Sequence, residues 1–189
     1  MTTHKRSLSF LLILSALMAF TSLSTDIYLP AMPTMEKQLS GNAELTITGF
    51  LTGFAIAQLI WGPISDRIGR KLPLFIGMVL FVIGSVGCAL SESMSAVVFW
   101  RIFQAVGACV GPMLSRAMIR DSFAQSQAAQ MLSTLTIIMA IAPIAGPFIG
   151  GSLLKVASWH WIFWLLAMIG VLDLLRKYPE DLQFPNEIR

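Results

Sequence analysis

The chain has 189 residues, of which 56% are hydrophobic and only 12% are charged, and its formal net charge is +3. A soluble domain usually carries about twice this fraction of charged residues, so the composition excludes an ordinary soluble protein and indicates an integral membrane protein. The net charge is too small to indicate a nucleic-acid partner. At about 20 residues per helical span, the chain has room for about six spans.

Six apolar segments of helical length follow one another along the chain, at residues 8–32, 45–64, 72–91, 95–116, 130–154 and 159–175. Their lengths, and the absence of alternating apolar and polar residues, favour helices over the strands of a barrel. The first segment is longer than the 7–15 apolar residues of a signal peptide, so we interpret it as a span that stays in the membrane.

The sequence therefore predicts an all-α membrane protein in which residues 1–175 form one six-helix unit. Residues 176–189 contain proline and mixed charges without an apolar period, which is typical of a short exposed tail.

Basic residues predict the orientation of the spans. If the N-terminus is cytoplasmic, ten basic residues lie on the cytoplasmic side and only Lys37 and Lys155 lie outside. The ten are Lys5, Arg6, Arg67, Arg70, Lys71, Arg116, Arg120, Arg176, Lys177 and Arg189. This bias follows the positive-inside rule and places both termini in the cytoplasm.

Two opposite charges, Asp26 and Arg101, lie well inside the spans and away from their ends. Asp26 lies seven residues before Pro33, about 10 Å from the outer end of the first span, and Arg101 lies six residues after Ser95, about 9 Å into the fourth span. A charge inside a membrane costs at least roughly 2.5–3.5 kcal/mol and normally faces the bundle interior with a partner. We therefore expect Asp26 and Arg101 to be close, in direct or water-bridged contact.

Two kinds of role fit this pair. In the structural one, the two charges form a static ion pair that orients two helices, or Asp26 simply lies near headgroup water. In the functional one, Asp26 takes up and releases a proton beside Arg101, and protons and a cationic substrate compete for its carboxylate.

The segment "GPISDRIGRK", residues 62–71, joins the second and third spans. Gly62 and Gly69 permit a tight turn, Asp66 stands where the helix meets the cytoplasm, and Arg67, Arg70 and Lys71 follow it. Basic residues alone would indicate an ordinary hairpin. The combination of glycines and an acid at these offsets is far more specific.

This segment resembles the signature loop of the major facilitator superfamily, G-x-L-[AS]-D-R-x-G-R-[RK], with Ile64 in place of the usual leucine. "RIFQAVGACVG", residues 101–111, resembles the fourth-span motif of the family through Arg101, Gln104 and Gly107, with Ala105 where the family has glycine.

The fifth span also resembles a motif of that family. "APIAGPFIGGSL", residues 142–153, is similar to the fifth-span motif of drug–proton antiporters, with Ala142 replacing its first glycine. The matched residues are Gly146, Pro147, Gly150 and Gly151, and Pro143 adds a second missing backbone donor. Prolines and glycines of this kind predict a kinked, closely packed helix.

"TDIYLPAMP", residues 25–33, is similar to the first span of the bicyclomycin-resistance (Bcr/CflA) efflux subgroup. The resemblance covers residues 5–172 and implies one six-helix half of a twelve-helix transporter. It further implies proton-coupled export of small drug-like molecules across a bacterial inner membrane, and a cytoplasmic gating loop at residues 62–71. It implies no cofactor.

The sequence departs from the family near Leu172, and the alternatives left open are a non-transporting fragment and a half-transporter active as a homodimer. A sugar symporter is disfavoured by "GPFIGG". The expected partners are therefore the lipid bilayer, protons, small drug-like substrates, and a second six-helix half or a second copy. No catalytic residue set, nucleotide loop or metal cluster is visible in the sequence, so we do not expect an enzyme.

Overall fold

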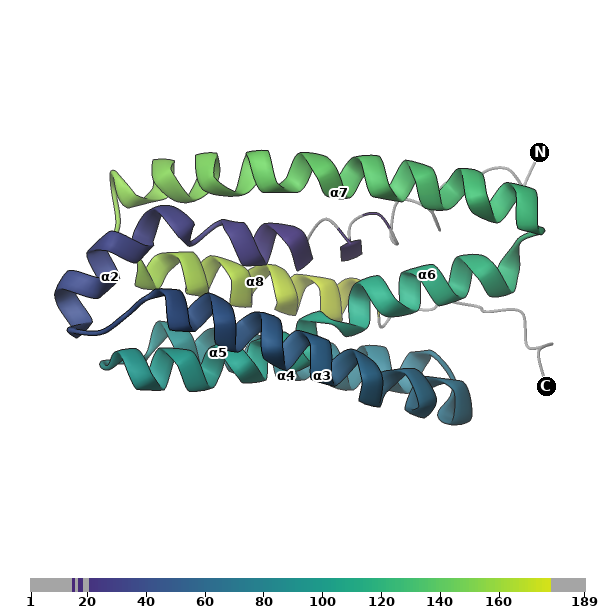
Figure 1. Ribbon diagram of the computed structural model, residues 1–189, viewed down its shortest axis with the longest axis horizontal. Helices are drawn as coiled ribbons and strands as arrows, with labels where there is room; N and C mark the ends of the chain where they lie inside the picture. The colour runs from purple at the N-terminus through teal and green to yellow at the C-terminus, as the bar shows by residue number, and fades with distance from the viewer. Residues whose placement is uncertain (1–14, 16, 19–20, 178–189) are drawn as a thin grey trace.

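The computed structural model of the protein describes residues 15, 17–18 and 21–177. Within these residues all regular secondary structure is helical, so the predicted all-α class is confirmed. The long helices run side by side along the longest axis of the molecule (Figure 1).

Residues 21–26 are helical and lead into the elements that follow. These are η1 (Leu29–Ala31), α2 (Met32–Leu39), α3 (Glu44–Ile68), α4 (Lys71–Ala89), α5 (Met94–Ala108), α6 (Val110–Ser122), α7 (Gln125–Leu154) and α8 (His160–Lys177). Length and apolar composition allow α3, α4, the joined α5–α6 and α7 each to cross a membrane, and α8 is a shorter apolar helix.

The first predicted span, 8–32, differs from the structure at its end, and its start lies largely outside the described residues. The helix at 21–26 gives way to a turn at 27–28 and to η1, after which α2 continues to Leu39. Pro30 explains the break, because proline has no backbone N–H to donate to the preceding turn.

Two other predicted spans differ in length or continuity. α7 begins five residues before the predicted start of the fifth span and is continuous through Pro143 and Pro147. The predicted fourth span is divided at Cys109 between α5 and α6. The predicted tail, apart from the end of α8, lies outside the described residues.

Side chains tie the two ends of the bundle together in different ways. At one end, Trp159 Nε1 donates to Gln38 Oε1 at 2.8 Å, which links the start of α8 to α2. At the other end, Arg70 Nη2 lies 3.1 Å from Asp121 Oδ2, which links the start of α4 to the end of α6. We refer to these as the Trp159 end and the Arg70 end.

Small residues let α4 and α5 approach each other closely. A Cβ atom on Gly84 would lie 2.5 Å from the backbone nitrogen of Gln104, and one on Gly107 would collide with the carbonyl oxygen of Gly77 and the backbone of Phe81. Helices in membranes associate through such small-residue contacts, since lipid supplies no hydrophobic drive between them. Gly107, predicted as part of a motif, thus holds the helix that carries Arg101 against α4.

Candidate functional site

Arg101 projects from α5 into the interior, and its side chain is fully buried. Its Nη1 donates to Gln104 Oε1 at 2.6 Å, one helical turn further on, and to the backbone carbonyl of Ser24 at 3.4 Å. Gln104 Nε2 in turn donates to Ser85 Oγ at 2.7 Å, and the Ser85 hydroxyl donates to the Phe81 carbonyl. The motif residues Arg101 and Gln104 therefore form one polar chain that joins the first helix, α5 and α4.

Aromatic rings surround the rest of the guanidinium. Arg101 Cζ lies 4.0 Å from the ring centroid of Tyr28, 4.4 Å from that of Phe50 and 5.9 Å from that of Phe163. Nε and Nη2 of Arg101 have no hydrogen-bond partner among the described residues. The ring faces, which attract a cation, partly compensate for its removal from water.

Tyr28 is held in this cage by its own hydroxyl group. The Thr46 hydroxyl donates to the Ala43 carbonyl, so the Tyr28 hydroxyl is the donor in its 3.2 Å contact with Thr46 Oγ1. The first helix and α3 are thereby linked beside Arg101. The cage residues Phe50 and Phe163 were not predicted from the sequence, because aromatic residues are common in every span and none of these carries a motif.

Asp26 lies at the contact between the first helix and α7. A Cβ atom on Gly146 would lie 3.0 Å from Asp26 Cβ and 3.2 Å from the backbone nitrogen of Ile27. A Cβ atom on Gly150 would overlap the carbonyl oxygen of Ile27. The predicted close packing of the 142–153 motif is thus against the segment that carries Asp26.

Asp26 and Arg101 form no direct ion pair in the structure, and the alternative of a water-bridged contact between them stays a prediction. Arg101 instead reaches the carbonyl of Ser24, which is fully buried, whereas Asp26 is only partly buried. Two residues along a helix are about 200° apart around its axis, so Ser24 and Asp26 face nearly opposite sides. The similar depth of Asp26 and Arg101 along their spans could not predict on which side of the first helix the Asp26 side chain lies.

The other residues of the fifth-span motif lie along α7. Pro143 is exposed and Pro147 partly buried, and nothing lies within 4 Å of a Cβ atom placed on Gly151. Gly146 and Gly150 therefore form the packed face of the motif, and Gly151 lies away from that contact.

The loop residues predicted as a gate gather at the Arg70 end. Arg70 Nη1 lies 2.7 Å from Asp66 Oδ1 and donates to Ser65 Oγ at 2.8 Å, while its Nη2 pairs with Asp121. Asp121 was missed by the sequence analysis. Asp121 could be noticed as an acidic residue among basic residues at the end of a span. No neighbouring sequence feature indicated its contact with Arg70, which lies 51 positions earlier.

The turn itself uses one glycine for its backbone conformation. Gly69 has φ +85°, a region that other residues adopt only with strain. Gly62 has no atom within 4 Å of an added Cβ atom, Arg67 is exposed, and Lys71 is the first residue of α4. Among the predicted loop residues, Asp66 and Arg70 thus form an ion pair, and Gly69 provides the backbone conformation of the turn.

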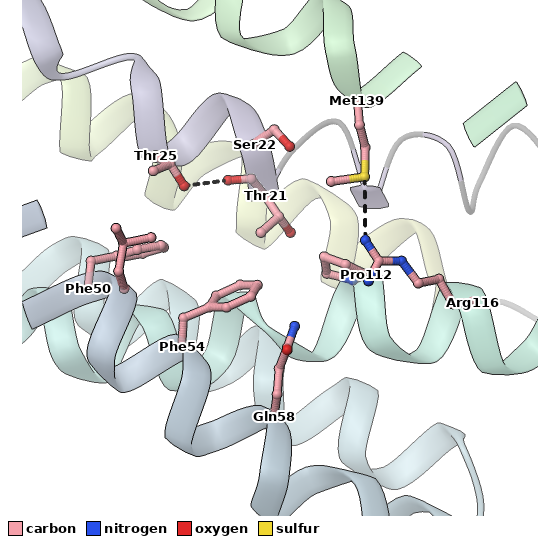
Figure 2. A pocket seen from close by; sticks show the side chains of 10 residues that line it. Thr21, Ser22, Thr25, Phe50, Phe54, Gln58, Pro112, Arg116 and Met139 are labelled. Atoms are coloured by element: carbon pink, nitrogen blue, oxygen red, sulfur yellow. Dashed lines mark hydrogen bonds between the residues drawn. The ribbon is translucent and has the colours of Figure 1, made fainter. Parts of the chain in front are cut away.

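A groove of about 250 Å³ lies between the first helix, α3, α6 and α7 (Figure 2). Thr21, Ser22 and Thr25 form one wall, and Phe50, Phe54 and Gln58 extend toward them from α3. Arg116 of α6 lies at one end beside Met139 of α7, with Nη2 4.0 Å from the thioether sulfur. The sequence analysis did not predict this groove.

The bundle of helices long and apolar enough to cross a membrane, with its buried polar chain and lateral groove, has the architecture of a helical membrane protein. Residues 12–185 match the Major Facilitator Superfamily, and the chain belongs to that family of transporters. The resemblance drawn from the four sequence segments is thus confirmed at the level of the family.

Several curated relatives are similar along nearly the whole chain. An MFS-type transporter of Bacillus subtilis, YdgK, is 40% identical over 92% of this chain and 44% of its own length. A bicyclomycin resistance protein homolog of Haemophilus influenzae is 31% identical over 91% of this chain and 44% of its own. Multidrug resistance protein D of Escherichia coli is 29% identical over 94% and 46%.

The fold also matches a solved structure. A bacterial homolog of the human lysosomal transporter Spinster superposes with a TM-score of 0.68 and 16% identity, over 90% of this chain and 42% of that one. The chain spans about half the length of the curated relatives it matches. The fold is therefore consistent with half of a transporter of this superfamily.

Proposed function

We propose that this chain forms the N-terminal half of a proton-coupled exporter of small drug-like molecules in a bacterial inner membrane. The names of the relatives in Haemophilus influenzae and Escherichia coli support a role in drug resistance. The proposed orientation, with both termini cytoplasmic, rests on the distribution of basic residues.

The observation that carries the proposal is the position of Asp26 on the backbone of α7. Its carboxylate belongs to a partly buried side chain inside a predicted span, and a Cβ atom on Gly146 of the antiporter-like motif would lie 3.0 Å from Asp26 Cβ. A carboxylate in such a place is costly when charged and less so when protonated. Uptake of a proton would therefore change the stability of the contact between the first helix and α7.

Arg101 provides a fixed charge beside this contact. It is bonded to the Ser24 carbonyl, two residues before Asp26, so a shift of the first helix also changes the environment of the guanidinium. We assign proton coupling to Asp26 and the positioning of the first helix to Arg101 and Gln104. The role of Asp66 and Arg70 is then to stabilise one gating state at the Arg70 end.

Alternating access in this fold requires a second six-helix body that rocks against the first around a central site. α7 presents a strongly exposed apolar face that includes Ile144, 76% exposed, and Phe148, 80% exposed. We propose that a second six-helix half covers part of this face, with a second copy of the chain as the alternative.

The experiment that tests the proposal uses Asp26→Asn in a transport-competent assembly reconstituted into liposomes. We expect efflux to lose its dependence on the proton gradient, since the amide cannot take up a proton. Glu92→Gln, an exposed change between α4 and α5, is the control and should preserve coupling. Gradient dependence that is the same in Asp26→Asn and in the parent would remove Asp26 from the mechanism.

A further inference from the structure

The groove beside the first helix has a charge that the proposed coupling site does not explain. Among the ten described residues that line it, Arg116 alone carries a formal charge, and Asp26 is not one of them. Arg116 is exposed and forms no ion pair with a described residue, and its Nη2 lies 4.0 Å from the weak acceptor Met139 Sδ. Its guanidinium donors are therefore available to a molecule in the groove.

The polar wall opposite has a defined hydrogen-bonding character. The Thr21 hydroxyl donates to the carbonyls of Leu17 and Ala108, and the Thr25 hydroxyl donates to the Thr21 carbonyl. Both hydroxyl hydrogens are thus used within the protein, and the oxygens remain as acceptors. The two threonines therefore offer a bound molecule no donor, and an acceptor ligand would find its donors at Gln58 and Arg116.

The apolar wall favours a flat ring. Phe50 and Phe54 lie one helical turn apart on α3, with ring centroids 6.1 Å apart and ring planes inclined by 26°. Gln58, a further turn along, continues the same line of side chains in Figure 2, and its amide group lines the same groove as Pro112 and Arg116. Aromatic faces stack with aromatic ligands.

From this arrangement we infer that the groove binds an aromatic carboxylate, with its ring against the partly buried Phe54, which packs on the buried Phe50, and its carboxylate toward Arg116 and Gln58. A planar guanidinium matches a carboxylate in a two-point hydrogen bond. The volume of about 250 Å³ lies just below the range of about 300–1,000 Å³ that holds drug-sized ligands, so a one- or two-ring compound fits. The inference rests on the proposed export function and specifies the chemical class of its substrate.

The inference reverses the expectation that a cation competes with protons at Asp26. A cation in the groove would meet the positive charge of Arg116, whereas a carboxylate would be attracted to it. The inference assigns proton binding and substrate binding to different residues: Asp26, which packs against α7 at Gly146, and Arg116 of α6, which lies in the groove.

Binding of three naphthalene compounds of similar shape tests the inference. The probes are 2-naphthoate, 2-naphthalenemethanol and 2-naphthylmethylammonium, titrated calorimetrically at neutral pH into the full chain in nanodiscs of zwitterionic lipid. Empty nanodiscs correct for partitioning into lipid. We expect naphthoate to bind about tenfold more tightly than the ammonium compound, with the alcohol between them.

Variants then assign this selectivity to residues. Arg116→Gln should weaken naphthoate binding about tenfold and leave the alcohol unchanged, Arg116→Lys should retain most of the preference, and Phe54→Leu should weaken all three compounds. Arg120→Gln, an exposed arginine one turn further on α6, is the matched control and should bind like the parent. Size exclusion and circular dichroism identify any variant that does not fold.

Two results would overturn the inference: equal or tighter binding of the ammonium compound, or naphthoate affinity that is unchanged in Arg116→Gln. Absence of selective binding by any probe would overturn it as well. Because binding is measured without a proton gradient, its outcome is separate from that of the efflux assay. Selective naphthoate binding without efflux by the transport-competent assembly would support the binding site and contradict the export function. Gradient-driven efflux of cations alone would support the export function and contradict the proposed substrate class.

Discussion

At the scale of single residues, the main feature is a buried positive charge, Arg101, that forms no ion pair with a carboxylate of the described residues. Arg101 is fully buried, and its strongest described contact is the 2.6 Å bond to Gln104, which is itself bonded to Ser85. Removal of one member of a buried polar chain leaves the others unsatisfied and costs more than the bond itself contributes. Gln104 is therefore a structural support for Arg101 as well as a motif residue.

Gln104→Leu tests this support. We expect the free energy of unfolding to fall by about 1–3 kcal/mol, because Arg101 Nη1 and the Ser85 hydroxyl lose a buried partner. Denaturant titration in a mild detergent, followed by circular dichroism, measures the change. Gln130→Leu, the same substitution at an exposed position of α7, should change stability by less than about 0.5 kcal/mol. Equal effects of the two substitutions would contradict the role given to Gln104.

At the scale of helices, the molecule is organised by close contacts at small residues. The contact of α7 with the first helix depends on Gly150, because any Cβ atom there would overlap the Ile27 carbonyl oxygen. The neighbouring Gly151 has open space within 4 Å. Two adjacent glycines of one motif therefore have different roles in this half of the molecule.

Gly150→Ala should separate the first helix from α7 and destabilise the protein by about 1–3 kcal/mol, the usual cost of overpacking. Gly151→Ala is the matched control and should be neutral or slightly stabilising, since alanine has a higher helix propensity than glycine. Thermal unfolding in detergent compares the two variants. A larger loss of stability in Gly151→Ala than in Gly150→Ala would show that this packing description is wrong.

A second contact between elements joins α3, α4 and α6 through Arg70. Its partners Asp66 and Asp121 are exposed, so each ion pair contributes only about 0–1 kcal/mol to stability. The main effect of the Arg70–Asp121 pair is to restrain the position of the start of α4 relative to the end of α6.

Arg70→Gln should therefore leave stability within about 1 kcal/mol of the parent but broaden the distances between α4 and α7 at the Arg70 end. Spin labels at Leu72 and Ser126, both exposed, report these distances by electron paramagnetic resonance. Arg120→Gln removes a nearby exposed charge without a described ion pair and should preserve the parent distribution. Identical distributions in Arg70→Gln and the parent would rule out the restraint.

At the scale of the whole molecule, the described residues form a helical body with a groove and an apolar face on α7. In the most apolar 18-residue stretch of α7, the longest described helix, only 12% is buried inside the structure. The chain also spans about half the length of its relatives. Both facts agree with the proposal that a second six-helix body covers part of α7.

A polypeptide of these 189 residues alone should not carry out gradient-driven efflux as a monomer, because one six-helix body cannot supply both gates. Reconstitution into liposomes, with the oligomeric state measured by light scattering, tests this expectation. Co-reconstitution with a second six-helix half is the positive arm. Efflux by a demonstrated monomer would contradict the two-body mechanism, and efflux by a dimer would favour the homodimer over the two-half assembly.

The class of the protein and its family could be predicted from the sequence because hydropathy, span length and motif spacing are local properties of a chain. The glycine and acidic residues of segment 62–71 and the Arg101–Gln104 pair are likewise recognisable without a fold, since each lies within a few residues of its partners. The proposed membrane orientation also depends only on counts of basic residues.

The partners of those residues were decided by the tertiary structure. Arg101 contacts the Ser24 carbonyl instead of Asp26, and Asp121 meets Arg70 across 51 positions of sequence. Depth in the membrane follows from residue number, but the direction in which a side chain points depends on the rotation of each helix against its neighbours. That rotation is set by packing at sites such as Gly107 and Gly150, which is why the groove at Arg116 is visible only once the helices are assembled.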